Sequence, residues 1–378
     1  MKECRSVGVI ALTLLILFSP LPISAQLSRY SQKFTVSKKN FVDSIEVSFE
    51  NGQVLVPVVI QQKQYRFLLD TGAGQAVVFA DCPIPNCEPA GQIISHDAVG
   101  HSDTVRMVKL PPMHIGTVGF SGCQATIQQR VVSNPDIDGI IGFDLVCKGL
   151  QMKIDVAHHL LILTDRKKFF DKEQGFEAKY KLNFHVPYIE VSPFKGYKEL
   201  VLFDTGSRHL FLMNKQHFDE AEKENPMEVT GQVEGRSEGR HAMGHQGAER
   251  LGEVVFLYLK NFSLGGCVLT DLRALTTQGG SHLGAQLLQY GAVVFNPKRN
   301  RLKFQPYEEG KTLSIGNDYE PLIFVIDQGR TVVGLVWEHG PAYDAGFRVG
   351  DVVLRKYVDG TYVLRDVQGQ EKEIKWKK

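Results

Sequence analysis

From about residue 40 onward, the chain alternates apolar and polar positions over short runs, which is the pattern of β-strands. Residues 44–49 alternate strictly, and residues 54–60 are rich in β-branched side chains after the turn-forming pair Asn51 and Gly52. Similar runs recur up to residue 165 with no long amphipathic helix between them. A charged patch at residues 165–177 predicts a surface connection or a short helix, after which the strand pattern resumes. The pattern predicts a mostly β protein.

Two of these apolar runs end in the same tight turn, and each turn carries a carboxylate. Residues 65–69 lead into Asp-Thr-Gly-Ala at 70–73, and residues 200–203 lead into Asp-Thr-Gly-Ser at 204–207. One Asp-Thr-Gly after a strand is also ordinary turn chemistry. Two carboxylates in matched backbone settings are what a pair of acids needs to activate water.

Other landmarks repeat in the same order, which indicates that the second half is a diverged copy of the first. The two turns lie 134 positions apart. Residues 98–101 resemble residues 242–245, and Gly122-Cys123 resembles Gly266-Cys267, both at an offset of 144. Gly142 and Gly284 follow related segments at an offset of 142. The change in offset predicts an insertion in the second copy, around residues 220–226.

These two turns, each followed by a downstream apolar-apolar-Gly segment, resemble those of the retropepsin- and pepsin-like (clan AA) aspartic peptidases. The resemblance covers about residues 44–307. It implies two pseudo-symmetric retropepsin-like β-barrel lobes that form a single-chain bilobal acid protease. It also implies that Asp70 and Asp204 are the catalytic pair at the interface between the lobes, and that the reaction needs neither a cofactor nor a metal.

The resemblance extends to residues around the acids. Thr71 and Thr205 are implied to hydrogen-bond across the lobes, and Gly142 and Gly284 to approach the turns closely. The residues expected to support the active site are Thr71, Gly72, Ala73, Thr205, Gly206, Ser207, Gly142 and Gly284. No Tyr-Gly flap motif of the pepsin type is present; the candidate flap residues are Val99, Gly100, His101, Met243, Gly244 and His245.

The two turns differ in one position, where Ala73 stands opposite Ser207. Close carboxylates share a proton and titrate as a pair. A serine hydroxyl that donates to its own carboxylate favours the charged form. We therefore expect Ser207 to keep Asp204 ionised, and Asp70 to hold the proton.

The end of the chain changes in pattern. Residues 332–336 predict a strand, residues 340–346 a short helix, and residues 349–354 another strand. Over about residues 316–378 the chain resembles a PDZ domain of the kind found in bacterial secreted peptidases. The resemblance implies a C-terminal peptide ligand that adds a strand to a sheet edge. A packing domain without a ligand is the alternative.

The first residues predict export. Lys2 and Arg5 precede an apolar run at residues 7–18 and then small residues, so residues 1–25 are expected to be a signal peptide and the protein to be periplasmic or extracellular. No later run is long enough to span a membrane. The expected units are a first lobe carrying Asp70 at 26–165, a linker and second lobe carrying Asp204 at 166–310, and the PDZ-like domain at 311–378.

Composition and cysteine and histidine positions limit the kinds of partner, disulfide and metal site that can be expected. The net charge of +1 excludes a general attraction to nucleic acid. Cys82 and Cys87 could close a small disulfide loop after export. His96, His101, His241 and His245 lack the spacing of metal ligands, so no metal site is expected.

Two functions remain open from the sequence. The first is an exported aspartic endopeptidase that hydrolyses peptide bonds with water activated by Asp70 and Asp204. The alternative is a non-catalytic protein that uses the same cleft and the PDZ-like domain to hold peptides.

Overall fold

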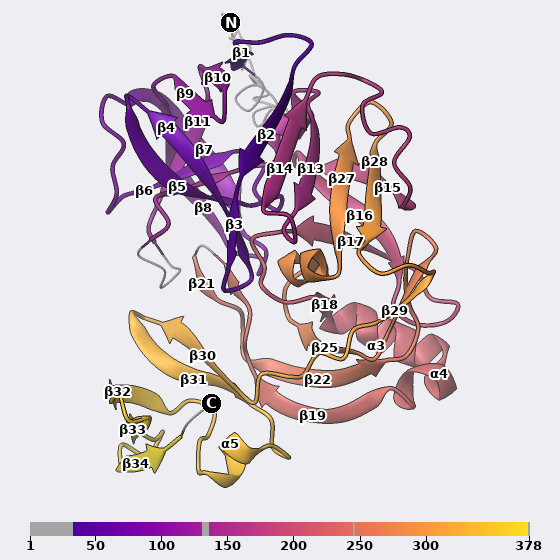
Figure 1. Cartoon of the computed structure of the whole chain (residues 1–378). Coiled ribbons are helices and arrows are strands. Elements are labelled where there is room, and N and C mark those ends of the chain that lie inside the picture. Colours follow the sequence, from indigo (N-terminus) through magenta and orange to yellow (C-terminus); the bar gives the residue numbers. More distant parts are fainter. Residues whose placement is uncertain (1–32, 131–135, 245, 377–378) are drawn as a thin grey trace, which may run out of the picture.

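The computed structural model describes residues 33–130, 136–244 and 246–376. The expected signal peptide at residues 1–25 and the candidate flap residue His245 lie outside these ranges. The described chain is mostly β and forms two lobes side by side with a small C-terminal sheet next to the second lobe (Figure 1).

The first lobe contains one sheet whose spatial order departs from chain order. Its strands follow the order β1-β10-β9-β4-β5-β12-β6-β11-β8-β7, and β3 (Ser48–Glu50) pairs with β4 beside this path. The strand bounds are β1 Thr35–Val36, β4 Gln53–Ile60, β5 Lys63–Leu69, β6 Ala76–Phe79, β7 Glu88–His96, β8 Ser102–Lys109, β9 Met113–Ile115, β10 Val118–Ser121, β11 Gln124–Gln128 and β12 Gly139–Ile141.

The second lobe repeats this order. Its strands run β24-β23-β16-β17-β26-β18-β25-β22-β19, which matches β10 to β7 of the first lobe strand for strand. The predicted duplication is therefore present in the fold. The strand bounds are β16 Val186–Ser192, β17 Glu199–Asp204, β18 Phe211–Asn214, β19 Val233–Gly239, β22 Gly252–Leu259, β23 Phe262–Leu264, β24 Cys267–Thr270, β25 Leu272–Thr277 and β26 His282–Gly284.

A third group of strands joins the lobes. It runs β2-β14-β13-β27-β28-β15, so three strands from each half of the chain lie in one continuous sheet. Its centre is the antiparallel pair β13 and β27, in which Ile154 lies opposite Val293. The strands just before residue 165, β13 and β14, thus belong to this shared sheet and not to the sheet of the first lobe. The bounds are β2 Val42–Glu46, β13 Gln151–Asp155, β14 Leu160–Thr164, β15 Phe176–Asn183, β27 Gly291–Asn296 and β28 Arg301–Pro306.

The main hydrophobic core runs under both lobes. Phe295 of β27 shows the continuity, because its ring lies 4.9 Å from that of Phe143 in the first half and 5.5 Å from that of Phe203 in the second. All three rings are fully buried. Burial of this size stabilises the pairing of the lobes by about 2 kcal/mol per aromatic side chain.

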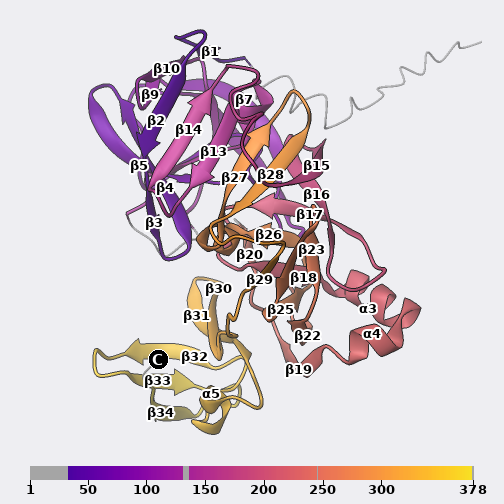
Figure 2. The ribbon, with the colours of Figure 1, turned by 45° about the vertical axis from the view of Figure 1, so that its right-hand side comes forward.

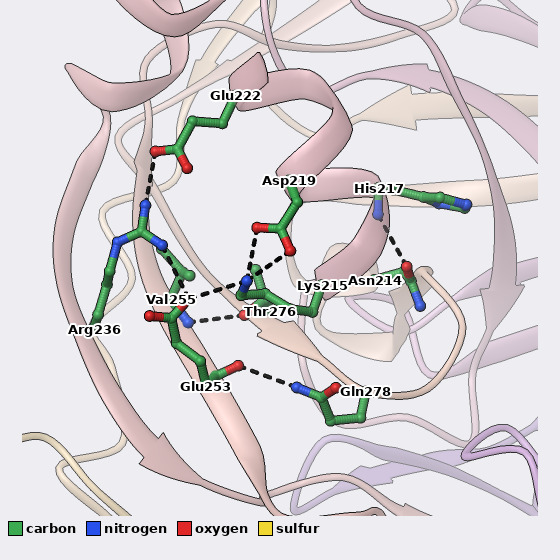
Figure 3. Close-up of polar contacts among 10 residues, drawn as sticks. All are labelled: Asn214, Lys215, His217, Asp219, Glu222, Arg236, Glu253, Val255, Thr276 and Gln278. Atoms are coloured by element: carbon green, nitrogen blue, oxygen red, sulfur yellow. Dashed lines mark hydrogen bonds and ion pairs between the residues drawn. The ribbon is translucent and has the colours of Figure 1, made fainter. Parts of the chain in front are cut away.

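The predicted insertion is confirmed as a pair of helices. Helices α3 (Lys215–Glu224) and α4 (Pro226–Thr230) lie between β18 and β19, where the first lobe has only turns. Asn214 begins α3 by accepting a hydrogen bond from the His217 amide at 3.0 Å. Figure 3 shows how ion pairs then tie α3 to the sheet: Lys215 contacts Glu253 at 3.0 Å, and Arg236 contacts the same carboxylate at 3.0 Å.

One expected equivalence between the halves is wrong. Gly266-Cys267 was matched with Gly122-Cys123, but in the structure it stands where Thr117-Val118 stands in the first lobe. Gly116 and Gly265 open the two corresponding hairpin turns, and both have φ +58°. The offset in residue number between β8 and β22 is larger than the matched landmarks suggested, because the loop between β19 and β22 is longer than that between β7 and β8. A Gly-Cys pair that occurs in both halves does not by itself show that the two pairs occupy equivalent turns.

The C-terminal sheet follows chain order, β30 to β34, around its own small core (Figure 2). The strand, short helix and strand expected there are confirmed. Strand β29 (Thr312–Ser314) pairs with β24 of the second lobe, so the C-terminal sheet begins at Leu322 and not at residue 311. The bounds are β30 Leu322–Asp327, β31 Arg330–Val336, α5 Pro341–Asp344, β32 Val352–Lys356, β33 Thr361–Arg365 and β34 Glu371–Lys375.

This C-terminal sheet packs on the second lobe. The Arg240 amide donates to the Gly334 carbonyl at 2.8 Å, and its guanidinium contacts Asp327 at 2.6 Å. Leu335 and Trp337 complete an apolar cluster with Phe256 of β22. The C-terminal unit therefore supports one face of the second lobe.

Two sequence expectations concern covalent and membrane features. Cys82 and Cys87 are both free thiols in the structure, so the disulfide considered for them is not formed. Within the described ranges, no helix is long and apolar enough to cross a membrane.

Candidate active site

The two acid turns sit at the ends of equivalent strands, β5 and β17. Side chains along a strand alternate between faces, so Phe67 and Leu69 enter the main core while Leu68 and Asp70 take the other face. In the second lobe Phe203 enters the same core, and Asp204 follows it on the opposite face. Each acid is thus delivered to the surface where the lobes meet.

Reciprocal hydrogen bonds between the two threonines hold the turns against each other. The Thr71 amide donates to the Thr205 hydroxyl oxygen at 3.0 Å, and the Thr205 amide donates to that of Thr71 at 3.0 Å. The Thr71 hydroxyl then donates to the Phe203 carbonyl at 2.6 Å, and the Thr205 hydroxyl to the Leu69 carbonyl at 2.6 Å. Both threonines are fully buried. Four buried bonds therefore define how far apart the two acids can stand.

The two carboxyl groups contact each other and the glycine of the opposite turn. The Asp70 and Asp204 side chains are within hydrogen-bonding reach. A Cβ atom on Gly72 would lie 2.6 Å from Asp204 Oδ1, and one on Gly206 would lie 2.7 Å from Asp70 Oδ2. Neither glycine could therefore carry a side chain without displacing an acid.

Backbone amides orient each carboxylate within its own turn. Asp70 Oδ1 accepts from the Gly72 amide at 2.8 Å and the Ala73 amide at 3.1 Å. Asp204 Oδ1 accepts from the Gly206 amide at 2.9 Å. These bonds favour the charged forms, because an amide donates to a carboxylate better than to a neutral acid.

Burial and the second acid outweigh the amides at Asp70. Burial raises the pKa of Asp70 well above its usual value, and the nearby Asp204 carboxylate raises that pKa further. Two acids this close ionise in succession, not together. The geometry therefore supports a pair that carries one shared proton, with Asp70 as its holder.

The cause expected from the sequence is different from the one observed. Among the described residues, no hydrogen bond joins the Ser207 hydroxyl to Asp204. The Ser207 hydroxyl lies instead beside Gly284, where a Cβ atom would be 3.1 Å from it. The Ala73–Ser207 difference therefore does not explain the asymmetry of the acids.

The two close-approach glycines occupy equivalent places. A Cβ on Gly142 would lie 2.7 Å from the Ala73 carbonyl oxygen, and one on Gly284 would lie 2.7 Å from that of Ser207. The next residues bond to these same carbonyls: the Phe143 amide donates to Ala73 at 2.7 Å and the Ala285 amide to Ser207 at 2.8 Å. Each glycine therefore lets a second segment cross directly behind an acid turn. Helix α2 (Asp144–Cys147) and the 3-10 helix η1 (Ala285–Gln289) follow them.

The first candidate flap is the tip of the β7–β8 hairpin, and it reaches the second lobe. The Ala98 carbonyl accepts from the Gly280 amide at 3.1 Å, and Val99 packs against the apolar cluster beside β22. Gly100 has φ +90° at the turn, which favours glycine. His101 Nδ1 lies 3.4 Å from an Asp97 carboxylate oxygen.

The second candidate flap is a short hairpin that meets the first. Strands β20 (Met243–Gly244) and β21 (Gly247–Ala248) pair with each other, and the Gln246 amide donates to Asp97 Oδ2 at 3.3 Å. The predicted flap residues on either side of His245 are thus brought together across the lobes.

Asp97 is the residue that the sequence did not single out. Its side chain is almost fully buried and accepts from the amides of Val99 at 3.2 Å and His101 at 2.8 Å. An aspartate directly before a turn that contains glycine is the available signal, because such residues hydrogen-bond to the backbone that follows them. Asp97 therefore organises the first tip and joins it to the second.

The other histidines singled out from the sequence bond to parts of the chain other than the acids. His96 bonds to Ser102 at the base of the tip. His241 is buried and contacts the Thr276 carbonyl at 2.8 Å. Among the described residues, no group of three or more histidine, cysteine or acidic side chains is arranged to hold a metal ion.

Comparison with known proteins gives one family match. Residues 56–145, from within β4 to the first half of α2, match the family model described as aspartyl protease. That segment contains Asp70 and Gly142. No curated protein matches the chain.

Solved structures of low identity resemble the chain over most of their own length. They are crystal structures of an aspartic proteinase from Irpex lacteus (14% identity, TM-score 0.47, 70% of this chain and 97% of that chain), of Basic 7S globulin from soybean (10%, 0.43, 70% and 94%) and of conglutin gamma, a basic 7S globulin from lupine seeds (13%, 0.42, 71% and 95%). Likenesses this distant say nothing of the chemistry.

Proposed function

We propose that this chain is an aspartic endopeptidase that hydrolyses peptide bonds with the Asp70–Asp204 pair. One observation carries the proposal: the buried reciprocal bonds of Thr71 and Thr205 hold two carboxyl groups in contact, where burial and the neighbouring Asp204 raise the pKa of Asp70. The aspartyl protease match of residues 56–145 supports the same assignment for the first lobe.

The mechanism follows from the unequal acids. A water between the carboxyl groups gives a proton to the ionised Asp204 as its oxygen attacks the peptide carbonyl carbon. Asp70 donates its proton to the carbonyl oxygen, which gives a neutral tetrahedral diol. A proton then passes from Asp204 to the leaving nitrogen, the carbon–nitrogen bond breaks, and a diol proton returns to Asp70. The pair regains its starting charge.

The joined hairpin tips provide the cover over this chemistry. Substrate entry requires the Asp97–Gln246 and Ala98–Gly280 contacts to open, because both cross between the lobes. Their closure excludes water and strengthens the hydrogen bonds around the acids.

We also propose that the protein is exported, on the basis of the basic and apolar residues at its N-terminus. For the C-terminal unit we propose support of the second lobe as its main role, since Leu335 and Trp337 pack there. Within the described residues β30 pairs only with β31, so its other edge is where an extended peptide ligand would add.

A digest of a peptide library tests the catalytic proposal. Wild type, Asp70→Asn and Asp204→Asn are compared, with Asp318→Asn as the control because that side chain is 90% exposed. Cleavage should disappear in both active-site variants and persist in the control. Cleavage that persists in either variant overturns the paired-acid mechanism. Peptide binding by wild type without any cleavage would favour the non-catalytic alternative.

A further inference from the structure

The two lobes present different side chains beside their acids, although their backbones match. In the first lobe Ile140 of β12 lies in register with Leu68 of β5 and Val77 of β6. In the second lobe the same place is taken by His282 of β26, in register with Leu202 and Leu212. A histidine therefore stands where the first lobe has isoleucine.

These positions lie on the face that carries the acids. Leu68 precedes Asp70 by two residues and Leu202 precedes Asp204 by two, so strand alternation places each leucine on the side of its acid. Ile140 and His282 are the cross-strand neighbours of those leucines and share the same face. Side chains at these positions therefore lie on the same face of their sheet as the acids.

The first lobe's catalytic face is apolar. Leu55, Leu68, Val77 and Phe79 form one buried cluster there, with Ile140 packed against it. The residues after its acid turn are Gly74 and Gln75, neither of which is charged. This half of the site suits an aliphatic or aromatic side chain.

The second lobe carries a cation and two imidazoles in the corresponding region. Arg208 and His209 take the places of Gly74 and Gln75, at the same offset as the acids. Arg208 is exposed and its guanidinium bonds to Gln53 Oε1 of the first lobe at 3.2 Å, so it lies at the junction of the lobes. His209 is within electrostatic reach of Arg208 and His282.

This basic group lacks a carboxylate of its own. No ion pair joins Arg208 to an acid among the described residues. Glu249, which lies 3.8 Å from the neighbouring His241, is already occupied, because it accepts from the amides of His241 and Ala242 at 2.9 Å each and from the Gln278 amide at 2.6 Å. Burial, and then the nearby His241, His282 and Arg208, lower the pKa of His209 to about 3, so that its imidazole is neutral.

We propose that Arg208, His209 and His282 form a subsite for an acidic side chain of the peptide substrate, while the aliphatic face of the first lobe takes an apolar side chain on the other side of the cleaved bond. This inference rests on the proposed peptidase function and names its substrate class. The carboxylate of a substrate glutamate or aspartate accepts from the Arg208 guanidinium and from an N–H of the His209 imidazole. His282 Nδ1 already donates to the Gly280 carbonyl at 3.0 Å, so His282 adds a donor at Nε2 when its ring is doubly protonated. The first flap closes over this subsite, since the Ala98 carbonyl bonds to Gly280, two residues before His282.

Matched fluorogenic peptides test the proposal. Each carries Glu, Gln or Leu at one of the two positions that flank the bond cut in the library digest. Wild type should cleave the Glu peptide roughly 10- to 100-fold better than the Leu peptide, in kcat/KM, at one of these positions only. Equal rates for Glu and Leu at both positions, or a preference for Leu at both, would overturn the subsite.

Three variants assign the preference to residues. Arg208→Gln changes an exposed side chain, and His282→Ile copies the first lobe; both should bring the Glu/Leu ratio close to one while cleavage of the Leu peptide continues. Ile140→Leu, the control in the first lobe, should keep the ratio. A ratio unchanged in Arg208→Gln and in His282→Ile would refute the assignment. The variant His282→Gln keeps a donor and shows whether loss of the ratio reflects misfolding.

Failure of the subsite can be told from failure of the peptidase. If wild type cleaves no peptide, fluorescence anisotropy with Asp70→Asn measures binding of the Glu and Leu peptides directly. Tighter binding of the Glu peptide would keep the subsite and reject only the catalysis. Equal binding would reject the subsite as well.

Discussion

Removal of one threonine hydroxyl should loosen the active site while the volume of the side chain stays nearly the same. Thr205→Val replaces a fully buried hydroxyl with a methyl group of similar size. The change leaves the Thr71 amide and the Leu69 carbonyl without their partners, because both bond to Thr205 Oγ1. An unpaired buried donor or acceptor costs about 1–3 kcal/mol, so we expect a loss of roughly 2–6 kcal/mol.

Calorimetry and kinetics would both report this change. A loss of that size lowers Tm by roughly 5–15 °C in a domain of this scale. The acids are also released from their fixed separation, and kcat/KM should fall about 100-fold, as expected for misplacement by about 1 Å. Thr71→Val removes the two opposite bonds and should behave alike, since the Thr205 amide and the Phe203 carbonyl then lose their partners.

Thr205→Ser is the matched control, because it keeps the hydroxyl and loses only a methyl group. It should melt close to wild type and retain most activity. If Thr205→Val also melted within about 1 °C of wild type with unchanged kcat/KM, the four cross-lobe bonds would not be what positions the acids.

Three further changes probe other parts of the fold. Burial raises the pKa of Asp144 to about 7, so the protein loses stability as pH rises from about 4 to about 7 and this buried carboxyl group must ionise. Asp144→Asn cannot ionise. Its free energy of unfolding in urea should exceed that of wild type by roughly 2–4 kcal/mol at about pH 8 and equal it near pH 4. Ser207→Ala should leave the acid limb of the pH–rate profile unchanged, because the hydroxyl lies beside Gly284; an upward shift would contradict this. Leu335→Ala, at a fully buried position, should cost about 2–5 kcal/mol and speed hydrogen exchange at Val99 in the same cluster; unchanged exchange would argue against support of the flap.

Local signals in the sequence were reliable where the backbone itself demands a residue type. Asn51 and Gly52 have φ values of +51° and +73°, as the turn between β3 and β4 requires. The short helix in the tail also appears where the pattern indicated. In each case neighbouring residues alone decide the structure.

Longer-range features were only partly predictable. The close-approach role of Gly284 was weakly indicated by His282 and Leu283. The bond from the Gly284 amide to the Leu210 carbonyl, and that from the Ala285 amide to the Ser207 carbonyl, give it the place that Gly142 has in the first lobe. Gly266 was matched to the wrong turn, because a repeated dipeptide carries no information on strand register. Asp97 was not singled out, because its importance comes from a partner, Gln246, about 150 positions away.

The sequence by itself determined that two equivalent Asp-Thr-Gly turns exist, because each depends on a strand, a carboxylate and a glycine that are contiguous in the chain. Only the tertiary structure decided how the turns meet and which side chains flank them. Arg208, His209 and His282 form one surface because parallel pairing of β17 with β26 brings together segments more than 70 residues apart. Strand pairing sets such neighbours, and it depends on every strand of the lobe at once.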